Sequence, residues 1–454
     1  MNQLRLILLL TLILLLSACG GSAEIASAPP TATRTPRPPT ATPFPSRTPA
    51  PPTDTPSPTN TPEPDATATP IPTNTPTPTV TPTAGPHAPD IAQPEYAASE
   101  CSDRFPCNDD IAAWEARIQV PAGFAVSYVA QFPNNDPNPN WPSLQPTSLT
   151  FGPDGKLYVA FTQGSIYTID ADGNTALFFD GLVVPTGLAF APDSDRLYVS
   201  SRVRDWHLDG EGQVLVIEDG QAVQIIGELP CCYLGMHAPN GIAFGPDGYG
   251  YVGVGGRADH GEILDGTNTQ DELLPFEAVI LRFSPDGTEV EVYARGLRNP
   301  YDIAWGGDGI LYATDNGRDE VPNSGEIVPE ELHAVIPGGE HGYPYYECDW
   351  CFGIPEGVEI VPPLVEFPAH SVPTGITAYL HEQFPGYYNS LFLTLWTALP
   401  FAESVVRVLP DGSHSTFATG FAAPIDVTVG PGGSLYVADY ATGIIFKISY
   451  VGEP

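Results

Sequence analysis

A short pattern that occurs six times constrains the fold of this chain more than any other feature of its sequence. In each copy a proline is followed, three residues on, by an aliphatic residue. The six copies begin at Pro146, Pro185, Pro239, Pro300, Pro373 and Pro424, with spacings of 39 to 73 residues. Internal repeats at such spacings are typical of propellers, solenoids and arrays, in which each repeat is one structural unit.

Each copy of the pattern leads into a predicted β-hairpin. Most copies reach a Gly/Pro/Asp-rich turn, at 153–155, 246–248, 307–309 and 431–433, and a second apolar segment follows the turn. Alternating apolar residues on both sides of a short Asp/Gly turn indicate a hairpin. Third strands follow in every copy and fourth strands in the first five, so each full repeat predicts four antiparallel strands.

The sixth repeat ends after its third strand, and the missing strand is found at residues 124–129, just before the first repeat. A ring whose last blade takes a strand from the N-terminal side of the domain leaves no unpaired edge where the ring closes. We therefore predict an all-β fold, a six-bladed β-propeller over residues 94–454, closed by an N-terminal strand. No helical period of consequence is found.

The first 18 residues predict a lipoprotein signal peptide. They contain one arginine and an apolar run over 6–16, which is shorter than the ~20 residues of a membrane-spanning helix. The small residues before Cys19 resemble a bacterial lipobox, and by that resemblance Cys19 would carry lipid as the mature N-terminus. The alternative is an ordinary signal peptide with a chance cysteine. We expect an extracytoplasmic protein, at the cell surface or in the periplasm, that meets the membrane only through its lipid anchor.

Residues 19–93 predict a linker. Thr, Pro and Ala repeats fill 29–89, and this composition cannot bury a core, whereas its prolines favour an extended polyproline II chain. A disordered stalk of this kind would hold the propeller away from the membrane. The formal net charge of −37, with only 17 Lys and Arg, argues against nucleic acid and anionic lipid surfaces as partners.

Seven cysteines are present, and six remain when Cys19 is set aside: Cys101, Cys107, Cys231, Cys232, Cys348 and Cys351. An even number in an exported chain indicates disulfides. The plausible local pairs are Cys101–Cys107 and Cys348–Cys351, which leaves the two adjacent cysteines. A vicinal disulfide is uncommon, so cross-pairing stays open.

Propeller geometry predicts where side chains from different repeats meet. Residues just before each innermost strand, and those between the second and third strands, gather at one mouth of the central channel. The first set holds His237, Arg298, Asn299 and His370, and the second holds residues 202–206, 257–260, 316–319 and Trp396. A candidate base, a fixed cation, amides and carboxylates that converge from distant segments predict a ligand-binding or active site.

Several motifs then resemble a known family. His237 stands eight residues before a Gly-Pro-Asp turn, Gly-Leu-Arg-Asn-Pro spans 296–300, and a run from Thr314 to Pro344 contains Asp-Asn-Gly-Arg-Asp, Glu-Glu-Leu and Gly-Gly-Glu-His-Gly-Tyr-Pro. From about 118 to 450 the chain resembles the glucose/sorbosone dehydrogenase family of soluble six-bladed propellers, which use pyrroloquinoline quinone (PQQ) and calcium. Residues 367–373 are similar to the sorbosone branch.

The resemblance implies oxidation of an aldose or related sugar, with electrons passing to an external acceptor. His237 would be the catalytic base that takes a proton from a sugar hydroxyl while a hydride passes to PQQ. Arg298 would stabilise charge on the quinone oxygen and, with Asn299 and Asn316, bind the cofactor. The alternative for Arg298 is a salt bridge between blades.

The same resemblance implies two calcium sites. Main-chain oxygens of Gly317 and Arg318 would hold the cofactor-side ion. Glu331 and the carbonyl of His341 would hold a structural ion, the alternative being that Glu331 is an exposed carboxylate. Asp259 or His260 would orient the base.

The sequence departs from the family pattern at three places. The family's aspartate after the histidine-bearing hairpin falls at Gly256, an arginine four residues past the histidine falls at Gly241, and residues 395–401 lack a basic residue. PQQ carries three carboxylates, which cations normally bind. Arg202, Arg204 or Arg257 would have to substitute.

Two other functions stay open. A calcium-dependent lactonase of the propeller class would hold its metal on axial carboxylates, for which Asp302 and Asp426 are candidates. A non-catalytic surface propeller would bind glycan or protein at the end of the stalk. In the second case His237 and Arg298 would be replaceable without loss of function.

Overall fold

The computed structural model describes residues 104–132, 144–192, 194–204, 210–232, 237–257, 273–318, 328–345, 354, 356–397 and 402–452. All of them belong to one compact unit, Thr79–Pro454. The predicted signal peptide, Cys19 and the whole predicted linker lie outside the described residues, as do Asp259, His260, Cys101, Cys348 and Cys351.

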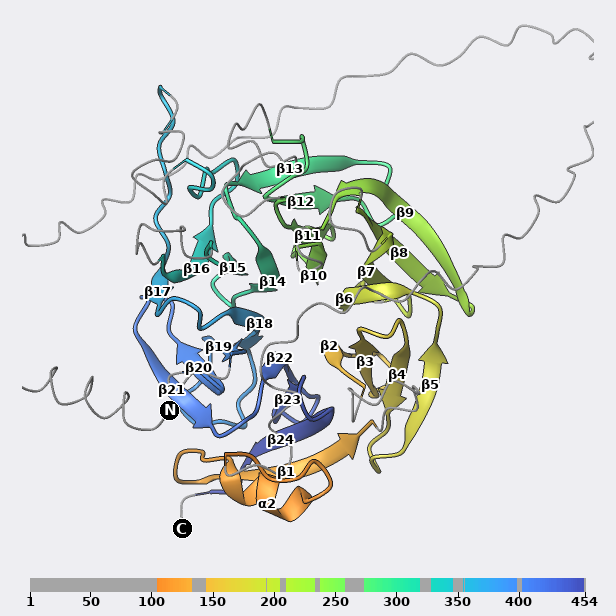
Figure 1. Cartoon of the computed structure of the whole chain (residues 1–454), viewed down its shortest axis with the longest axis vertical. Coiled ribbons are helices and arrows are strands. Elements are labelled where there is room, and N and C mark those ends of the chain that lie inside the picture. Colours follow the sequence, from red (N-terminus) through yellow and green to blue (C-terminus); the bar gives the residue numbers. More distant parts are fainter. Residues whose placement is uncertain are drawn as a thin grey trace, which may run out of the picture. The chain divides into compact units, whose positions relative to one another are not determined.

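Six four-stranded antiparallel sheets form the predicted propeller and are arranged as a ring (Figure 1). The first three blades, from the innermost strand outward, are β2 (Pro146–Phe151), β3 (Leu157–Phe161), β4 (Ile166–Ile169) and β5 (Thr175–Phe179); β6 (Val183–Phe190), β7 (Leu197–Arg204), β8 (Glu211–Glu218) and β9 (Gln221–Pro230); β10 (Pro239–Phe244), β11 (Gly250–Val254), β12 (Val279–Phe283) and β13 (Val290–Arg295). The next two are β14 (Pro300–Trp305), β15 (Leu311–Asp315), β16 (Glu330–Val335) and β17 (Val365–Phe367); β18 (Pro373–Tyr379), β19 (Ser390–Leu395), β20 (Ser404–Val408) and β21 (His414–Thr419).

The sixth blade confirms the predicted closure. It contains β22 (Pro424–Val429), β23 (Leu435–Asp439) and β24 (Ile444–Tyr450), and its outer strand is β1 (Phe124–Gln131) from the N-terminal side. β1 pairs with β24 from Phe124 opposite Tyr450 to Gln131 opposite Ile444. The ring is therefore closed by main-chain hydrogen bonds between two segments about 300 residues apart in sequence.

A short helix differs from the prediction that no helix would matter. α2 (Ile111–Arg117) begins after Asp110, whose side chain accepts a hydrogen bond from the Ala113 N–H, and it buries Trp114. Because the helix has only two turns, its apolar period is too short to stand out in the sequence. No described helix is long and apolar enough to span a bilayer.

The proline of each repeat has a clear structural consequence. The pairing of the innermost strand with the second strand is interrupted just after this proline in five blades, and near it in the blade that starts at Val183. Proline has no N–H to donate, and a bulge leaves the next residues outside the ladder. The aliphatic residue three places on returns to the core in every blade, with 2–6% exposure.

The residues released by the bulge bind the neighbouring blade. Thr147 donates from its hydroxyl to the Pro185 carbonyl (2.6 Å), and Thr186 donates in the same way to the Pro239 carbonyl (2.6 Å). The sixfold pattern therefore encodes contacts between blades as well as the strands themselves.

Asp302 and Asp426 use the same bulge to bridge blades. Asp302 accepts from the Ile303 and Ile376 N–H groups (2.9 and 2.8 Å), one on each oxygen. Asp426 likewise accepts from Val427 and Leu149 (2.7 and 2.6 Å). Every oxygen of both carboxylates thus has a backbone donor, which assigns the two residues to the junctions between blades.

Small residues make room for this arrangement. A Cβ at Gly241 would overlap the Asp302 carboxylate, and a Cβ at Gly375 would overlap that of Asp426. The glycine at position 241, where the family has arginine, therefore has a packing reason.

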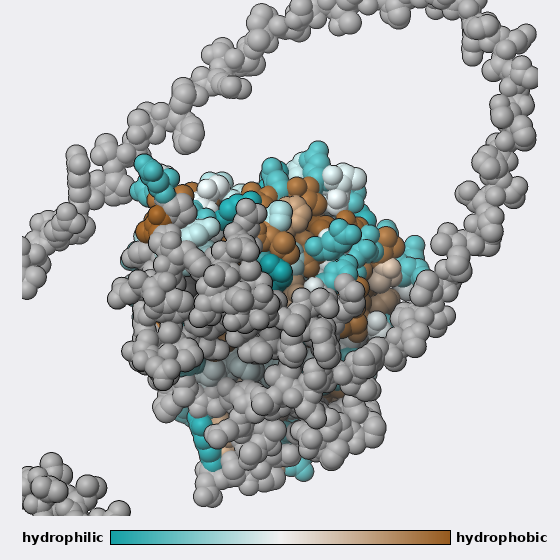
Figure 2. Space-filling view, turned by 45° about the horizontal axis from the view of Figure 1, so that its top comes forward, coloured by the Kyte–Doolittle hydropathy of each residue, from teal (hydrophilic) through white to brown (hydrophobic). Residues whose placement is uncertain are grey.

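The outer strands carry some of the exposed apolar residues. Leu177 and Phe178 on β5 and Val223 on β9 are 40–57% exposed. On the coloured part of the surface in Figure 2, hydrophobic and hydrophilic residues are interspersed. Isolated surface apolar residues of this kind need no binding partner to explain them.

The aspartate pair predicts how stability depends on pH. Burial raises the pKa of Asp302 to about 7, and burial together with the charge of Asp302 raises the pKa of Asp426. The folded protein thus holds protons that the unfolded chain releases above about pH 4, so stability falls as the pH rises from about 4 to about 7. We expect Asp426→Asn to lower stability at pH 5 but to flatten this decline, measured by urea unfolding from about pH 5 to about pH 8.

The matched control for this measurement is Asp411→Asn, because Asp411 is exposed and hydrogen-bonded only within its own turn. A decline that is equally steep in the wild type and in Asp426→Asn would contradict the assignment.

Candidate functional site

The peptide group of Gly256 contacts both predicted catalytic residues, His237 and Arg298. His237 precedes β10, Gly256 follows β11, and Arg298 precedes β14. The Gly256 carbonyl lies 2.8 Å from Nδ1 of His237, and the Gly256 N–H donates to the Arg298 carbonyl (2.7 Å). The predicted convergence of these residues, from two blades, is confirmed.

The contact with Gly256 sets the tautomer of His237. A carbonyl oxygen only accepts, so Nδ1 must carry the hydrogen, and the lone pair of the neutral ring is on Nε2. Burial lowers the pKa of His237 well below its usual value of 6.5, and the charge of Arg298 lowers it further, while the bond to Gly256 acts in the opposite direction. His237 is therefore neutral, and able to accept a proton, at neutral pH.

A carboxylate shapes the loop that carries Arg298. Asp315 accepts from the backbone N–H groups of Arg298 (2.9 Å) and Asn299 (2.6 Å). In the sixth blade Asp439 holds Ala422 and Ala423 in the same way (2.7 and 3.1 Å). The loop shape is thus a property of the fold, whereas the arginine and asparagine side chains are specific to the fourth blade.

Arg298 itself is buried, with 4% exposure, and its Nη1 donates to the Asn316 carbonyl (2.9 Å). A guanidinium held in this way is a fixed positive charge beside the imidazole.

Three amide side chains continue the site across blades three to five. Asn240 Nδ2 donates to Asn299 Oδ1 (2.9 Å), and Asn299 Nδ2 donates to Asn316 Oδ1 (3.0 Å). Asn316 Nδ2 then donates to the Pro373 carbonyl (2.7 Å). The chain of bonds orients all three amides, and it includes two of the predicted cofactor-binding residues.

Gly317 and Arg318 lie next to this chain. The Gly317 N–H donates to Glu330 Oε2 (3.0 Å), and Glu330 Oε1 accepts from the His370 N–H (3.0 Å). Glu330, the first glutamate of the Glu-Glu pair, is therefore a residue that holds this loop. It also brings the main chain of His370 to the site.

Glu331 and His341 meet through a third residue. Glu331 Oε2 lies 3.0 Å from His333 Nε2, and His341 Nδ1 lies 3.1 Å from His333 Nδ1. Burial, and then the charge of Glu366, raise the pKa of Glu331 to about 7. Burial lowers the pKa of His333 to about 3, and burial together with His333 lowers that of His341 to about 3. The alternative that Glu331 is an exposed carboxylate is wrong.

Of the three candidate substitutes for the missing basic residue, Arg202 fits best. It is buried, with 4% exposure, and its charge acts on the hydroxyls of Tyr301 and Tyr440 in two other blades. Arg257 instead forms an ion pair with Glu277 (3.0 Å), and the side chain of Arg204 lies outside the described residues. Tyr440 also packs edge to face against Trp396, with 5.6 Å between ring centroids.

The pairing of the two adjacent cysteines, which the sequence leaves open, is visible in the structure. Cys231 and Cys232 form a vicinal disulfide, buried with Ala238 beside His237. Cross-pairing of these two cysteines is therefore excluded. Cys107 is also disulfide-bonded.

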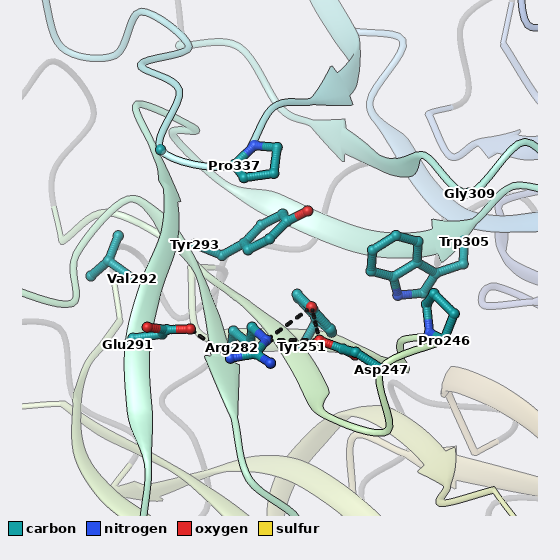
Figure 3. A pocket seen from close by; sticks show the side chains of 11 residues that line it. Pro246, Asp247, Tyr251, Arg282, Glu291, Val292, Tyr293, Trp305, Gly309 and Pro337 are labelled. Atoms are coloured by element: carbon teal, nitrogen blue, oxygen red, sulfur yellow. Dashed lines mark hydrogen bonds and ion pairs between the residues drawn. The ribbon is translucent and has the colours of Figure 1, made fainter. Parts of the chain in front are cut away.

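The groove in Figure 3 lies elsewhere, between blades three and four at the Gly245–Gly248 turn. This turn is at the end of β10 and β11 opposite to His237. Its polar groups are already paired, since Arg282 binds Asp247 (2.9 Å) and Tyr251 donates to Asp247 (2.9 Å). Related Asp–Tyr pairs occur in two other blades, so this groove is a feature of the repeat.

A model of the glucose/sorbosone dehydrogenase family matches residues 221–447. The chain belongs to the glucose/sorbosone dehydrogenase family. An uncharacterized protein of Borreliella burgdorferi is 24% identical over 367 residues, which are 73% of this chain and 91% of that protein.

Solved structures share the fold of this family member. A putative oxidoreductase (glucose dehydrogenase) from Thermus thermophilus matches with a TM-score of 0.54 and 22% identity, over 72% of this chain and 99% of that one. The PQQ-bound aldose sugar dehydrogenase of Streptomyces coelicolor matches with a TM-score of 0.54 and 21% identity, over 73% and 99%. The soluble aldose sugar dehydrogenase of Escherichia coli matches with a TM-score of 0.54 and 18% identity, over 72% and 99%.

Sequence reasoning missed three residues of this family member's site: Asn240, Glu330 and His333. Asn240 had a signal, because it stands one residue after the repeat proline, where three other blades have threonine. Glu330 and His333 had none, since nothing in the sequence says which residues of β16 face the channel-side loop.

The amide chain generates a stability prediction. Asn299→Ala would leave Asn240 Nδ2 and Asn316 Oδ1 without their partner, and each buried polar group left unsatisfied costs about 1–3 kcal/mol. We expect the free energy of unfolding to fall by about 2–4 kcal/mol in urea. Asn174→Ala, at an exposed turn, is the control, and equal losses in the two variants would contradict the prediction.

Proposed function

We propose that this protein oxidises an aldose or related sugar outside the cytoplasm, with PQQ and calcium as cofactors. The observation that carries the proposal is the buried His237 ring, whose Nδ1 is fixed by the Gly256 carbonyl beside the Arg298 guanidinium. A neutral base next to a fixed cation suits removal of a hydroxyl proton in a step that moves negative charge towards the cation.

The residues divide the work as follows. PQQ, when bound, supplies the acceptor for the hydride from the sugar carbon. His237 accepts the hydroxyl proton at Nε2, and its Nδ1–H stays on the Gly256 carbonyl, which keeps the ring in place. Arg298 keeps the imidazole neutral before the reaction and offers positive charge to an electron-rich oxygen.

The donor chemistry of the site fits the cofactor. Three buried guanidinium side chains, from Arg202, Arg298 and Arg318, are present in a strongly acidic chain, and planar guanidinium groups suit carboxylates. Trp396 and Tyr440 add aromatic surface. Calcium readily accepts main-chain carbonyls, so Gly317 and Arg318 would hold the cofactor-side ion and Asn316 would lie beside it.

The remaining parts of the proposal follow from the sequence. The predicted lipobox at Cys19 and the Thr/Pro-rich linker would anchor the enzyme to the membrane and hold it at a distance. Electrons would leave to an external acceptor, and the net charge of −37 argues against nucleic acid as a partner.

Titration of the protein with PQQ and calcium tests the proposed function. We expect saturable binding, followed by absorbance, and dye-linked oxidation within a panel of small aldoses. His237→Ala should abolish turnover, by about 100-fold or more, while PQQ binding survives. His414→Ala, at an exposed histidine, is the control. No binding at micromolar PQQ would overturn the proposal and leave a non-catalytic propeller.

The pH dependence of the reaction rate should also reflect the lowered pKa of His237. We expect turnover to hold as the pH falls through 6.5, because the base stays neutral there. Arg298→Met removes a cause of the low pKa, so the acid limb of log kcat/KM should move to higher pH. The control Arg407→Met, in blade five, should leave the pH of the acid limb unchanged. A wild-type limb near 6.5, or no movement in Arg298→Met, would contradict the account.

A further inference from the structure

The groove between blades three and four contains a cluster of three aromatic rings. Tyr251 on β11 is buried, and it packs edge to face against Tyr293 on β13 (4.9 Å between ring centroids, 85° between ring planes). It packs in the same way against Trp305 on β14 of the next blade (5.1 Å, 76°). The groove has a volume of about 530 Å³ (Figure 3). Pockets that bind small ligands have volumes of ~300–1,000 Å³.

The first blade has the same cluster, built from apolar residues. Tyr158 packs there against Phe178 (4.9 Å, 83°) and against Phe190 of the next blade (5.0 Å, 71°). On the neighbouring strand Thr168 lies opposite Tyr158, at the position that Arg282 has in blade three. Phenylalanine and threonine are therefore sufficient for the packing between blades. Packing does not explain why the groove has tyrosine, tryptophan and arginine at these three positions.

The indole N–H of Trp305 has no role in the packing of the blades. Nε1 is buried and donates to none of the residues that the structure describes. Three other blades have phenylalanine at this position of the repeat: Phe151, Phe190 and Phe244. Phenylalanine would fill the space without leaving a buried donor unsatisfied, which destabilises a folded protein. Buried donors of this kind are usually satisfied by water or a ligand.

The ion pairs of Arg282 leave part of the groove's hydrogen-bonding capacity unused. Arg282 donates from Nε to Asp247 (2.9 Å) and from Nη1 to Glu291 Oε1 (2.7 Å). Within the described part of the chain, Arg282 Nη2, Glu291 Oε2 and the Tyr293 hydroxyl form no hydrogen bond. The side chains of Arg282 and Glu291 are 23% and 64% exposed, so both are accessible to a ligand.

These features indicate the chemical class of the ligand. One guanidinium between two carboxylates provides no excess of positive charge for an anion, and it keeps a cation away from the carboxylates. A hydroxyl group can donate to a carboxylate and accept from a guanidinium. A sugar ring has hydroxyl groups around its edge and apolar C–H groups on its faces, and the C–H groups suit contact with aromatic rings.

We propose that this groove binds a neutral saccharide through Tyr293, Trp305 and Arg282. The two aromatic rings contact the apolar faces of the sugar, and Arg282 Nη2 and Glu291 Oε2 bind its hydroxyl groups. The groove lies at the end of β10 and β11 opposite to His237, so a glycan bound there leaves the candidate active site open. The inference does not rest on the proposed sugar oxidation, because neither His237 nor PQQ takes part in it.

Isothermal titration calorimetry of the full chain without PQQ tests the proposal. The probes are cellopentaose, xylopentaose and maltopentaose, with polygalacturonate as an anionic comparison. We expect saturable binding of a neutral probe. Trp305→Phe and Arg282→Thr introduce the residues of the first blade, and each should weaken binding by about 10-fold or more.

Two controls separate this groove from other parts of the ring. Arg407 has the position of Arg282 in blade five, opposite Phe392, and Arg407→Thr should bind the probe as the wild type does. His237→Ala should also bind it unchanged, because His237 lies at the other end of the blades.

Circular dichroism shows which variants are folded, and Tyr293→Phe replaces a variant that does not fold. The proposal is overturned if no neutral probe binds with a Kd below about 1 mM, or if polygalacturonate binds more tightly than the neutral probes. It is also overturned if the folded groove variants bind as the wild type does, or if His237→Ala abolishes binding. PQQ binding is measured separately, so failure here leaves the proposed function untouched.

Discussion

The peptide at Gly256 is the interaction on which the candidate site depends. Its carbonyl orients His237 and its N–H holds the main chain of Arg298. The loop is tightly packed: a Cβ at Gly256 would lie 3.2 Å from the Tyr343 hydroxyl, and one at Gly255 would lie 2.8 Å from the Cβ of His237. A main-chain carbonyl thereby contacts His237 from the position where the family resemblance places an aspartate.

This exchange changes the chemistry of the base. A carboxylate behind a histidine stabilises the imidazolium and raises the histidine pKa, whereas a neutral carbonyl does so less. With Arg298 adjacent, the balance favours the neutral ring. The low pKa of His237 therefore follows first from burial of the ring and then from the charge of Arg298 in the next blade, and the bond to the Gly256 carbonyl offsets only part of this shift.

The sixfold repeat explains how distant residues reach this loop cluster. The pairing irregularity at each repeat proline leaves one or more residues outside the ladder, and most blades use this stretch for contacts with the next blade. In blade three the freed residue is Asn240, and it binds Asn299. The site is thus built on positions that other blades use for cohesion.

These repeats also decide how much the sequence could predict. Blade number, strand order and closure by β1 followed from the Pro-x-x-aliphatic spacing, because that spacing is a backbone requirement. The convergence of His237, Arg298 and Asn299 followed from the same geometry. The Gly256 carbonyl, the contacts of Glu330 and the Cys231–Cys232 pairing could not be predicted, because backbone orientation in loops leaves no pattern in residue type.

The tautomer of His237 is the most direct test of the account, and nitrogen-15 NMR of the imidazole rings measures it. The chain has nine histidines, and a spectrum of His237→Gln assigns the signal. We predict a hydrogen on Nδ1 and an unprotonated Nε2, both unchanged from about pH 8 to about pH 6. A hydrogen on Nε2, or titration near 6.5, would contradict the central role of the Gly256 carbonyl.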